Sequence, residues 1–227
     1  MARSIIVTGG FGELGRHVAT AFAARGDNVA RFDYARSPSD GIEGVVDFGG
    51  VDLTDIKAVE DTVEKAAHAL GSIDVLVNIA GGFIWETLSD GGAATWSRMF
   101  AMNALTCVNV TRTALPKLLE ARSARIINIG AGSAVVAASG MGSYAASKAA
   151  VHRFTESLAD ELKHEDVTVN AILPSIIDTP TNRRDMPDAK FEDWVRPEAI
   201  ADVILFLASP AARSISGALI PVTKGTI

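Results

Sequence analysis

Short apolar runs rich in β-branched residues alternate along the chain with longer segments in which apolar residues recur every three or four positions. The short runs are typical of strands buried on both faces, and the longer segments are typical of amphipathic helices. The predicted strands are 4–8, 28–33, 45–48, 73–78, 125–129, 167–173 and 218–222. The predicted helices are 13–25, 55–70, 93–121, 144–163 and 198–208. This alternation predicts right-handed βαβ units, and therefore a mostly parallel sheet with helices on both faces.

The chain contains neither an internal repeat nor a linker-like stretch. We therefore expect a single α/β domain over residues 1–227, built as a doubly wound parallel sheet in three layers. The helical pattern at 93–121 contains Pro116, and because proline removes a helical hydrogen bond, a break in this helix is expected there. The segment 174–197 is rich in proline, aspartate and arginine and is expected to be a loop.

A glycine-rich turn, Thr8-Gly9-Gly10-Phe11-Gly12-Glu13-Leu14-Gly15, joins the first strand to the first helix. Small residues let the backbone approach a pyrophosphate, and the start of a helix supplies unpaired N–H groups and a positive dipole end. Such turns also serve close packing alone, but the strand–turn–helix context favours a dinucleotide site in a Rossmann-type sheet. The residues assigned to the cofactor here are Gly9, Phe11, Gly12, Glu13, Leu14 and Gly15.

Asp33 ends the second predicted strand, 18 residues after Gly15. A carboxylate at this position is suited to accept hydrogen bonds from an adenosine ribose and repels a 2′-phosphate, which favours NAD(H) over NADP(H). Arg16, Arg31 and Arg36 lie nearby in the sequence and are suited to neutralise a phosphate. A solvated carboxylate at a strand end is the alternative explanation for Asp33.

Tyr144 and Lys148 lie four residues apart at the start of a helical pattern. On a helix this spacing puts both side chains on one face. An ammonium group favours phenolate over phenol, so Lys148 is expected to lower the pKa of Tyr144 from its usual value of about 10. The pair is therefore suited to acid–base chemistry, although Tyr and Lys occur at this spacing on many helices that carry out no reaction.

Composition narrows the range of partners. The 227 residues are 48% hydrophobic and carry a net charge of −6 without a cluster of lysine and arginine, so we expect no nucleic-acid partner. No apolar run reaches the ~18 residues of a membrane span, and no His, Cys or carboxylate group has the spacing of metal ligands, so neither membrane nor metal is expected. The single cysteine, Cys107, fits a reducing, cytoplasmic location.

In their order and spacing these features resemble the short-chain dehydrogenase/reductase family over nearly the whole chain. The resemblance is carried by the glycine turn, Asn78-Ile79-Ala80-Gly81, Asn103, Tyr144-x-x-x-Lys148 and Pro174-Ser175-Ile176-Ile177-Asp178-Thr179. It implies an NAD(P)-dependent oxidoreductase that transfers hydride between nicotinamide and a small carbonyl or alcohol substrate, with 174–197 as the substrate loop.

The resemblance also implies roles for individual residues. Tyr144 would give or take the proton, Lys148 would hold the nicotinamide ribose, and Asn103 would hold a water beside Lys148. The further cofactor contacts that it implies are Asp52, Leu53, Asn78, Ala80, Gly81, Tyr144, Lys148, Pro174, Ile177 and Thr179.

The chain departs from the family pattern at three positions. Glu13 and Ser175 each stand where the family has glycine, and Ala131 stands where the family has its catalytic serine, 13 residues before the tyrosine. Ser133 either supplies the missing hydroxyl or only caps its loop. Ala131 and Glu13 also suggest an alternative, a non-catalytic nucleotide-binding or regulatory protein of the same fold.

Several segments resemble dihydropteridine reductase, a member of the same superfamily that also has alanine at the serine position. These segments are 9–15, Gly140-Met141, Ala150-Val151-His152, 178–187 and 216–220. This likeness implies a quinonoid substrate, whereas the broader family implies a carbonyl or alcohol. The family also implies a homodimer or homotetramer formed through helices 93–121 and 144–163.

Overall fold

The structure, a computed structural model, describes residues 2–224; residues 1 and 225–227 of the predicted domain lie outside this part. Its strands are β1 (Ser4–Thr8), β2 (Asn28–Asp33), β3 (Val45–Gly49), β4 (Val75–Asn78), β5 (Ala124–Ile129), β6 (Val167–Pro174) and β7 (Leu219–Val222). They form one parallel sheet in the order β3-β2-β1-β4-β5-β6-β7. The predicted parallel α/β sheet is confirmed, and its order reverses between β1 and β4, where such folds bind ligands.

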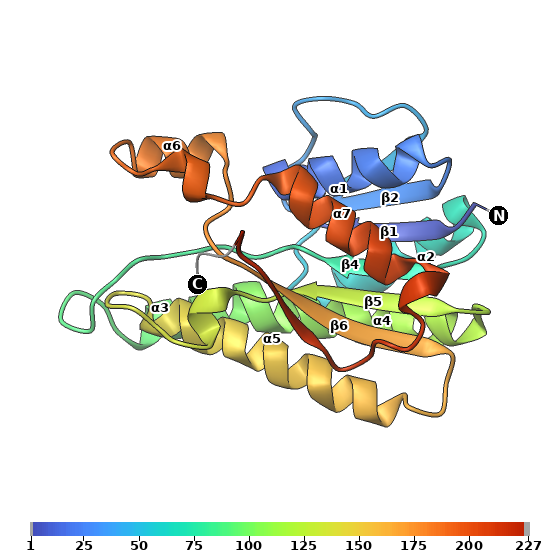
Figure 1. The fold of residues 1–227 in the computed structure, drawn as a ribbon. Coiled ribbons are helices and arrows are strands. Elements are labelled where there is room, and N and C mark those ends of the chain that lie inside the picture. Colours follow the sequence, from blue (N-terminus) through green and yellow to red (C-terminus); the bar gives the residue numbers. More distant parts are fainter. Residues whose placement is uncertain (1, 225–227) are drawn as a thin grey trace.

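Helices cover both faces of the sheet (Figure 1). They are α1 (Glu13–Ala24), α2 (Ile56–Leu70), α3 (Ala93–Phe100), α4 (Thr106–Glu120), α5 (Gly142–Glu161), α6 (Pro180–Asp185) and α7 (Pro197–Ala208). The core on one face is built with α1 and α7, and the core on the other face with α2, α4 and α5. None of the helices within residues 2–224 is long and apolar enough to cross a membrane.

The continuous apolar runs have a direct explanation in these two cores. Ile6 of β1 packs in the core with α2 and α4, whereas its neighbours Ile5 and Val7 pack in the core with α1 and α7. Successive strand side chains point to opposite faces, so a sheet covered on both sides needs apolar residues at every position. At the ends of α2, the Asp55 carboxylate accepts from the Lys57 N–H, and Gly71 adopts φ +80°.

The predicted break at Pro116 is wrong. Pro116 lies inside α4, which continues to Glu120, and the interruption comes earlier, at a π-helical turn, Ala101–Leu105, between α3 and α4. A π turn carries one residue more than an α turn and so changes the direction in which side chains point. This turn contains Asn103, whose amide bonds to the chain that leaves β4.

The segment 174–197, expected to be a loop, is more ordered than its composition suggests. It contains α6 and a 3₁₀ turn, Phe191–Asp193. The Asp178 N–H bonds to the Val195 carbonyl at 2.8 Å, and the Val195 N–H bonds to the Ile176 carbonyl at 2.9 Å. The two ends of the segment are thus joined, and α6 projects from them beyond the sheet (Figure 1).

Candidate active site

The glycine turn packs against the end of β4. Gly9 has φ +64°, and a Cβ atom there would lie 2.9 Å from the Ala80 nitrogen. A Cβ at Gly15 would lie 2.2 Å from the Gly9 carbonyl oxygen, so helix α1 can approach the turn only with glycine at this position. Gly12 begins α1 without a side-chain cap. The first N–H groups of α1 therefore point at the turn with no side chain in front of them, which fits a pyrophosphate.

The remaining residues predicted for the turn take two orientations. Leu14 is buried in the core, and Glu13 pairs with Arg16 at 2.9 Å, so only the backbone of these two residues is directed to the turn. Asp33 lies beside the turn, where its carboxylate accepts from the N–H groups of Phe11 and Ala35, each at 2.9 Å. Asp33 is thus held in place at the end of β2 and remains partly exposed.

The three arginines near Asp33 are not equivalent. Arg31 is fully buried and forms a two-point ion pair with Asp47, at 2.7 and 2.9 Å. Arg16 is paired with Glu13 and lies 3.7 Å from Asp40. Carboxylates therefore neutralise Arg16 and Arg31, whereas Arg36 is exposed.

Asp52 and Leu53, which the resemblance assigns to the cofactor, follow β3 and differ in exposure. The Asp52 carboxylate accepts from the N–H and hydroxyl groups of Thr54, and these hydrogen bonds lower its pKa. Leu53 is buried in the core with α2 and α4. Any contact of Leu53 with a nucleotide would thus involve its backbone.

Asn78 belongs to a buried polar network rather than to the surface. Its amide nitrogen donates to the Thr111 hydroxyl and to Asn128 Oδ1, both at 2.9 Å, and Asn128 in turn donates to Thr155 of α5 at 2.9 Å. Burial raises the pKa of the Cys107 thiol to about 12, so the thiol stays protonated beside Asn128 Oδ1. The network ties β4 and β5 to α4 and α5 behind the site.

Ala80 and Gly81 lie where the chain leaves β4. The Thr8 hydroxyl accepts from the N–H groups of Ile79 and Ala80, which joins the ends of β1 and β4. A Cβ at Gly81 would lie 2.4 Å from Asn103 Oδ1 and 3.4 Å from Lys148 Nζ. The structure thus brings Gly81, Asn103 and Lys148 together at the carboxyl edge of the sheet.

Asn103 is buried, and both the oxygen and the nitrogen of its amide are hydrogen-bonded. Its oxygen accepts from the Gly82 N–H, and its nitrogen donates to the Gly82 carbonyl and to the Ser147 hydroxyl, all at 3.0 Å. The amide therefore connects the π turn to the β4–α3 loop and to α5.

Lys148 is buried, and its ammonium donates to the Ile129 carbonyl at 2.7 Å. Burial lowers the pKa of Lys148 to about 8 and raises that of Tyr144 to about 12. The expectation that Lys148 lowers the pKa of Tyr144 is therefore wrong in direction. The phenol packs edge-to-face on Phe83, with the ring centroids 4.9 Å apart, and the hydration that it loses on burial raises its pKa.

Ala131, at the serine position, is buried, and its N–H bonds to His152 Nε2 at 3.3 Å. Ser133 lies in a 3₁₀ turn, Gly132–Ala134, and its partly buried hydroxyl has no hydrogen-bond partner among residues 2–224.

Pro174 closes β6, Ile177 forms a bridge with Val195, and Thr179 caps α6 by accepting from the Asn182 N–H. These residues lie at the same edge as the glycine turn because parallel strands end on one side.

Two residues of this edge, His152 and Phe83, are missing from the site predicted from sequence. His152 continues the spacing of Tyr144 and Lys148 by a further four residues, so helical periodicity alone was sufficient to place it on their face. Phe83 follows two glycines in a loop, and no periodic signal points to its contact with Tyr144.

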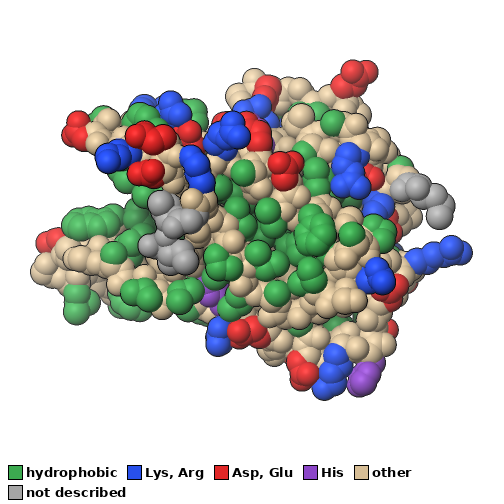
Figure 2. All heavy atoms as spheres, in the orientation of Figure 1, with side chains coloured by type: hydrophobic (Ala, Val, Ile, Leu, Met, Phe, Trp, Pro, Cys, Tyr) green, Lys and Arg blue, Asp and Glu red, His purple; other side chains and the backbone are tan. Residues whose placement is uncertain are grey.

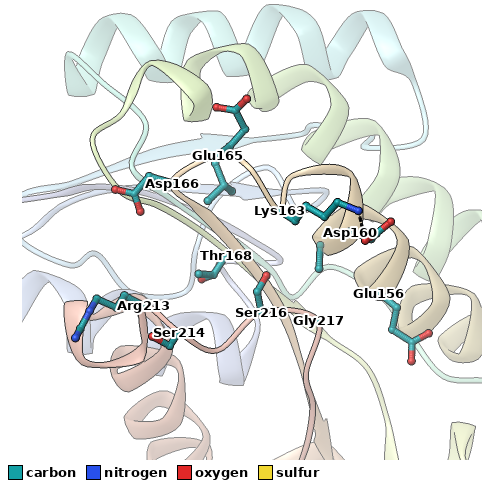
Figure 3. A pocket seen from close by; sticks show the side chains of 12 residues that line it. Glu156, Asp160, Lys163, Glu165, Asp166, Thr168, Arg213, Ser214, Ser216 and Gly217 are labelled. Carbon is teal, nitrogen blue, oxygen red and sulfur yellow. Dashed lines mark hydrogen bonds and ion pairs between the residues drawn. The ribbon is translucent and has the colours of Figure 1, made fainter.

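Two cavities in the described part of the chain lie outside this cluster. One of about 460 Å³ lies at the opposite end of the sheet, between α5, the start of β6 and the segment before β7; charged side chains line it, and Lys163 pairs with Asp160 (Figure 3). Another, of about 340 Å³, lies where α1, α6 and α7 begin and includes Glu13, Asp178 and Arg183. Within residues 2–224, no group of three or more His, Cys, Asp or Glu side chains could hold a metal.

A doubly wound parallel sheet with a glycine turn at its switch point, and a Tyr–Lys helix at the same edge, defines the class of nicotinamide-dependent oxidoreductases. The sequence profile of the short chain dehydrogenase family matches residues 3–190, and the chain belongs to this family. It is an NAD(P)-dependent oxidoreductase with the fold and nucleotide-binding turn of that family.

Individual relatives agree with this assignment. The chain is 30% identical to 3-oxoacyl-[acyl-carrier-protein] reductase FabG of Thermotoga maritima, over 98% of this chain and 96% of that protein. It is also 30% identical to meso-2,3-butanediol dehydrogenase of Serratia marcescens, over 97% and 93%. Its fold is similar to the ligand-free aldohexose dehydrogenase of Thermoplasma acidophilum, with a TM-score of 0.89, 25% identity and coverage of 99% and 93%. These relatives support the broad family and not a specific likeness to dihydropteridine reductase.

Burial at His152 predicts a pH-dependent stability. Burial, and then the charges of Arg153 and Lys148, lower the pKa of His152 to about 4 from its usual value of 6.5. The neutral imidazole thus contributes stability that is fully present above pH 6.5 and is lost as the pH falls towards 4. His152→Gln keeps an acceptor but cannot titrate, so the fall in Tm between pH 6.5 and 4 should become shallower, with each kcal/mol appearing as about 2–4 °C.

Calorimetry of wild type and His152→Gln between pH 4 and pH 6.5 measures the change of Tm with pH. His68→Gln, at an exposed position of α2, serves as the matched control and should leave the wild-type slope unchanged. Parallel curves for wild type and His152→Gln would contradict the prediction.

Proposed function

We propose that the chain reduces a small carbonyl compound, or a quinonoid one, at the expense of a reduced nicotinamide dinucleotide, with Tyr144 as the acid. The observation that carries the proposal is the convergence of Lys148 and Asn103 on Gly81, beside the helix that bears Tyr144. A buried ammonium without a carboxylate partner costs free energy and is hard to explain as a structural element alone.

The residues present fit the dinucleotide. The N-terminus of α1 with Gly9, Phe11, Gly12 and Gly15 would hold the diphosphate, Asp33 would hold the adenosine ribose, and Lys148 the nicotinamide ribose. Ala80, Pro174, Ile177 and Thr179 would border the nicotinamide. A bound nicotinamide supplies the hydride, which carries both electrons to the carbonyl carbon.

Tyr144 supplies the proton that balances the reduction. With a pKa near 12 the phenol is protonated at neutral pH, so it donates to the carbonyl oxygen as the hydride arrives and the product is an alcohol. Asn103 positions the β4–α3 loop and, with its remaining lone pair, a water that returns the proton.

Ser133 is proposed to donate the second hydrogen bond to a ketone oxygen. Ala131 cannot donate from its side chain, and the Ser133 hydroxyl lies two residues further on with no partner within the described chain. A quinonoid substrate regains conjugation on reduction and so needs less help from such a donor. The two substrate classes therefore differ in their dependence on Ser133.

NAD(H) is proposed as the preferred dinucleotide. Asp33 is fixed by two backbone N–H groups and remains partly exposed. Arg16 and Arg31, which were suited to counter its charge, are already paired with carboxylates. Of these three arginines, Arg36 is the one without a carboxylate partner among residues 2–224.

A homodimer or homotetramer is the proposed assembly, as is typical of the family, and the single buried cysteine Cys107 fits a cytoplasmic location. The alternative of a non-catalytic nucleotide-binding protein is favoured by Ala131 and Glu13 alone. Glu13 is weak support for the non-catalytic alternative, because its side chain pairs with Arg16 away from the turn.

Removing the proton donor should abolish turnover. For Tyr144→Phe we expect kcat to fall by about 10²–10⁴ with NADH affinity nearly unchanged, because the phenol acts in proton transfer. Steady-state oxidation of NADH with a panel of ketones and quinones, together with a fluorescence titration of NADH, makes the test. Unchanged turnover would remove Tyr144 from the mechanism, and wild-type protein that binds NADH but oxidises none would favour the non-catalytic alternative.

Ser133 separates the substrate classes. Ser133→Ala should lower kcat/KM for a simple ketone by about 10²–10³, the usual effect of losing one donor to a developing oxyanion. With a quinone the fall should be only a few-fold. The comparison uses one preparation and both substrates, and an equal, small effect on both would exclude Ser133 as the donor.

The charge of Asp33 should decide the cofactor. Asp33→Asn keeps an oxygen for the Phe11 N–H but removes the charge, so we expect NADH affinity to fall about tenfold, as for a lost charge-assisted hydrogen bond. NADPH affinity should rise because the repulsion of the 2′-phosphate is gone. Fluorescence titrations of wild type and variant with both dinucleotides test this; wild type that binds NADPH more tightly would overturn the proposed preference.

A further inference from the structure

Exposed aromatic and aliphatic side chains lie near Tyr144. Phe83 contacts the Tyr144 ring edge-to-face yet is 52% exposed, and Trp85, two residues on, is 59% exposed. Val135 and Val136 of the opposite loop are exposed as well. Large apolar side chains that stay exposed next to reactive groups typically line a ligand site. In Figure 1 the loops after β4 and after β5 extend to one end of the molecule. Figure 2 shows hydrophobic side chains on the surface at this same end.

The wall formed by Phe83, Trp85, Val135 and Val136 is held in a defined position. The Trp85 indole N–H donates to the Ser139 carbonyl at 3.1 Å, and the Glu86 N–H donates to the Gly140 carbonyl at 2.9 Å. Gly140 adopts φ +75°, and a Cβ there would lie 2.3 Å from the Trp85 ring. The two loops are therefore in contact, and the indole packs against Gly140.

Phe83 is fixed from its other side. Asn103 bonds both backbone groups of the preceding residue, Gly82, and a Cβ at Gly82 would lie 2.3 Å from the Met102 sulfur. The backbone therefore has little freedom next to Phe83, although the ring itself is half-exposed. A ring that is anchored and exposed loses little conformational entropy when a ligand packs on it.

From this placement we infer that Phe83 is a specificity-determining residue that selects substrates with an aromatic or conjugated ring next to the reacting carbonyl. The inference rests on the proposed function, because it takes Tyr144 as the proton donor. A carbonyl oxygen that reaches the phenol brings its neighbouring substituent against the Phe83 ring. Paired aromatic rings gain more than the burial of their area alone, whereas a saturated ring or chain gains only the burial.

Acetophenone and cyclohexyl methyl ketone provide the matched probes, since they share one carbon skeleton and differ in the aromaticity of the ring and its conjugation with the carbonyl; the effect of Phe83→Leu on their ratio removes this intrinsic difference. We expect wild-type protein with NADH to prefer acetophenone in kcat/KM, and Phe83→Leu to lose about 2- to 10-fold of that preference, the usual strength of an aromatic pair. Phe206→Leu, on α7 and 47% exposed, is the matched control and should keep the wild-type ratio.

Failure of this inference can be distinguished from failure of the proposed function. Turnover of both ketones without an aromatic preference, or a preference that Phe83→Leu retains, would overturn this inference while leaving Tyr144 as the acid. If neither ketone is reduced, binding of the same pair to the NADH-saturated protein by saturation-transfer NMR decides, and equal binding of both counts against it. Light scattering completes the test, because a change of assembly in Phe83→Leu would assign the ring to a contact between copies of the chain.

Discussion

The hydrogen bonds between the Asn103 amide and both backbone groups of Gly82 are the constraint on which the carboxyl edge of the sheet depends. They exist because the π turn Ala101–Leu105 directs Asn103 towards the loop that leaves β4. The same amide reaches Ser147 of α5, so one buried side chain holds the loop and the helix together. Together with the network of Asn78 and Asn128, this amide fixes where Gly81 and Lys148 face each other.

Two buried polar groups at this edge reduce the stability of the fold. The Lys148 ammonium is buried with a backbone carbonyl as its acceptor, and Asn78 Oδ1 has no hydrogen-bond partner in the described chain. Both features oppose folding, since a buried charge or an unpaired oxygen gives up its hydration. The apolar strands around them, such as Ile5–Val7 at 0% exposure, supply the stability that tolerates them.

The fold could be predicted from the sequence because its signal is distributed over many residues. Seven apolar runs and the helices between them lead to one parallel arrangement, and no single position decides it. The interruption near Asn103 could not be predicted in this way, because it depends on a side chain bonding to a loop 21 residues away in the chain. Pro116 was the stronger local signal, but in the folded helix α4 it is accommodated without a break.

The candidate site likewise contains residues that local spacing predicts and features that depend on long-range contacts. Gly9, Gly15, Asp33, Tyr144 and Lys148 occupy positions that local spacing predicts. The pKa of Tyr144 depends on what surrounds the phenol, and spacing alone gave the wrong direction because it counted the cation and not the lost water. The wall around Phe83 depends on two loops meeting through Trp85 and Gly140, a long-range contact without a periodic pattern.

Tyr144, Lys148 and His152 occupy three successive turns of α5, and each reaches a different partner at the carboxyl edge: the Phe83 ring, the Ile129 carbonyl and the Ala131 N–H. Their spacing of four residues follows the turns of an α-helix. The distances between the phenol, the ammonium and the strand end are therefore set by one rigid helix. The loops that face this helix can diverge without changing those distances.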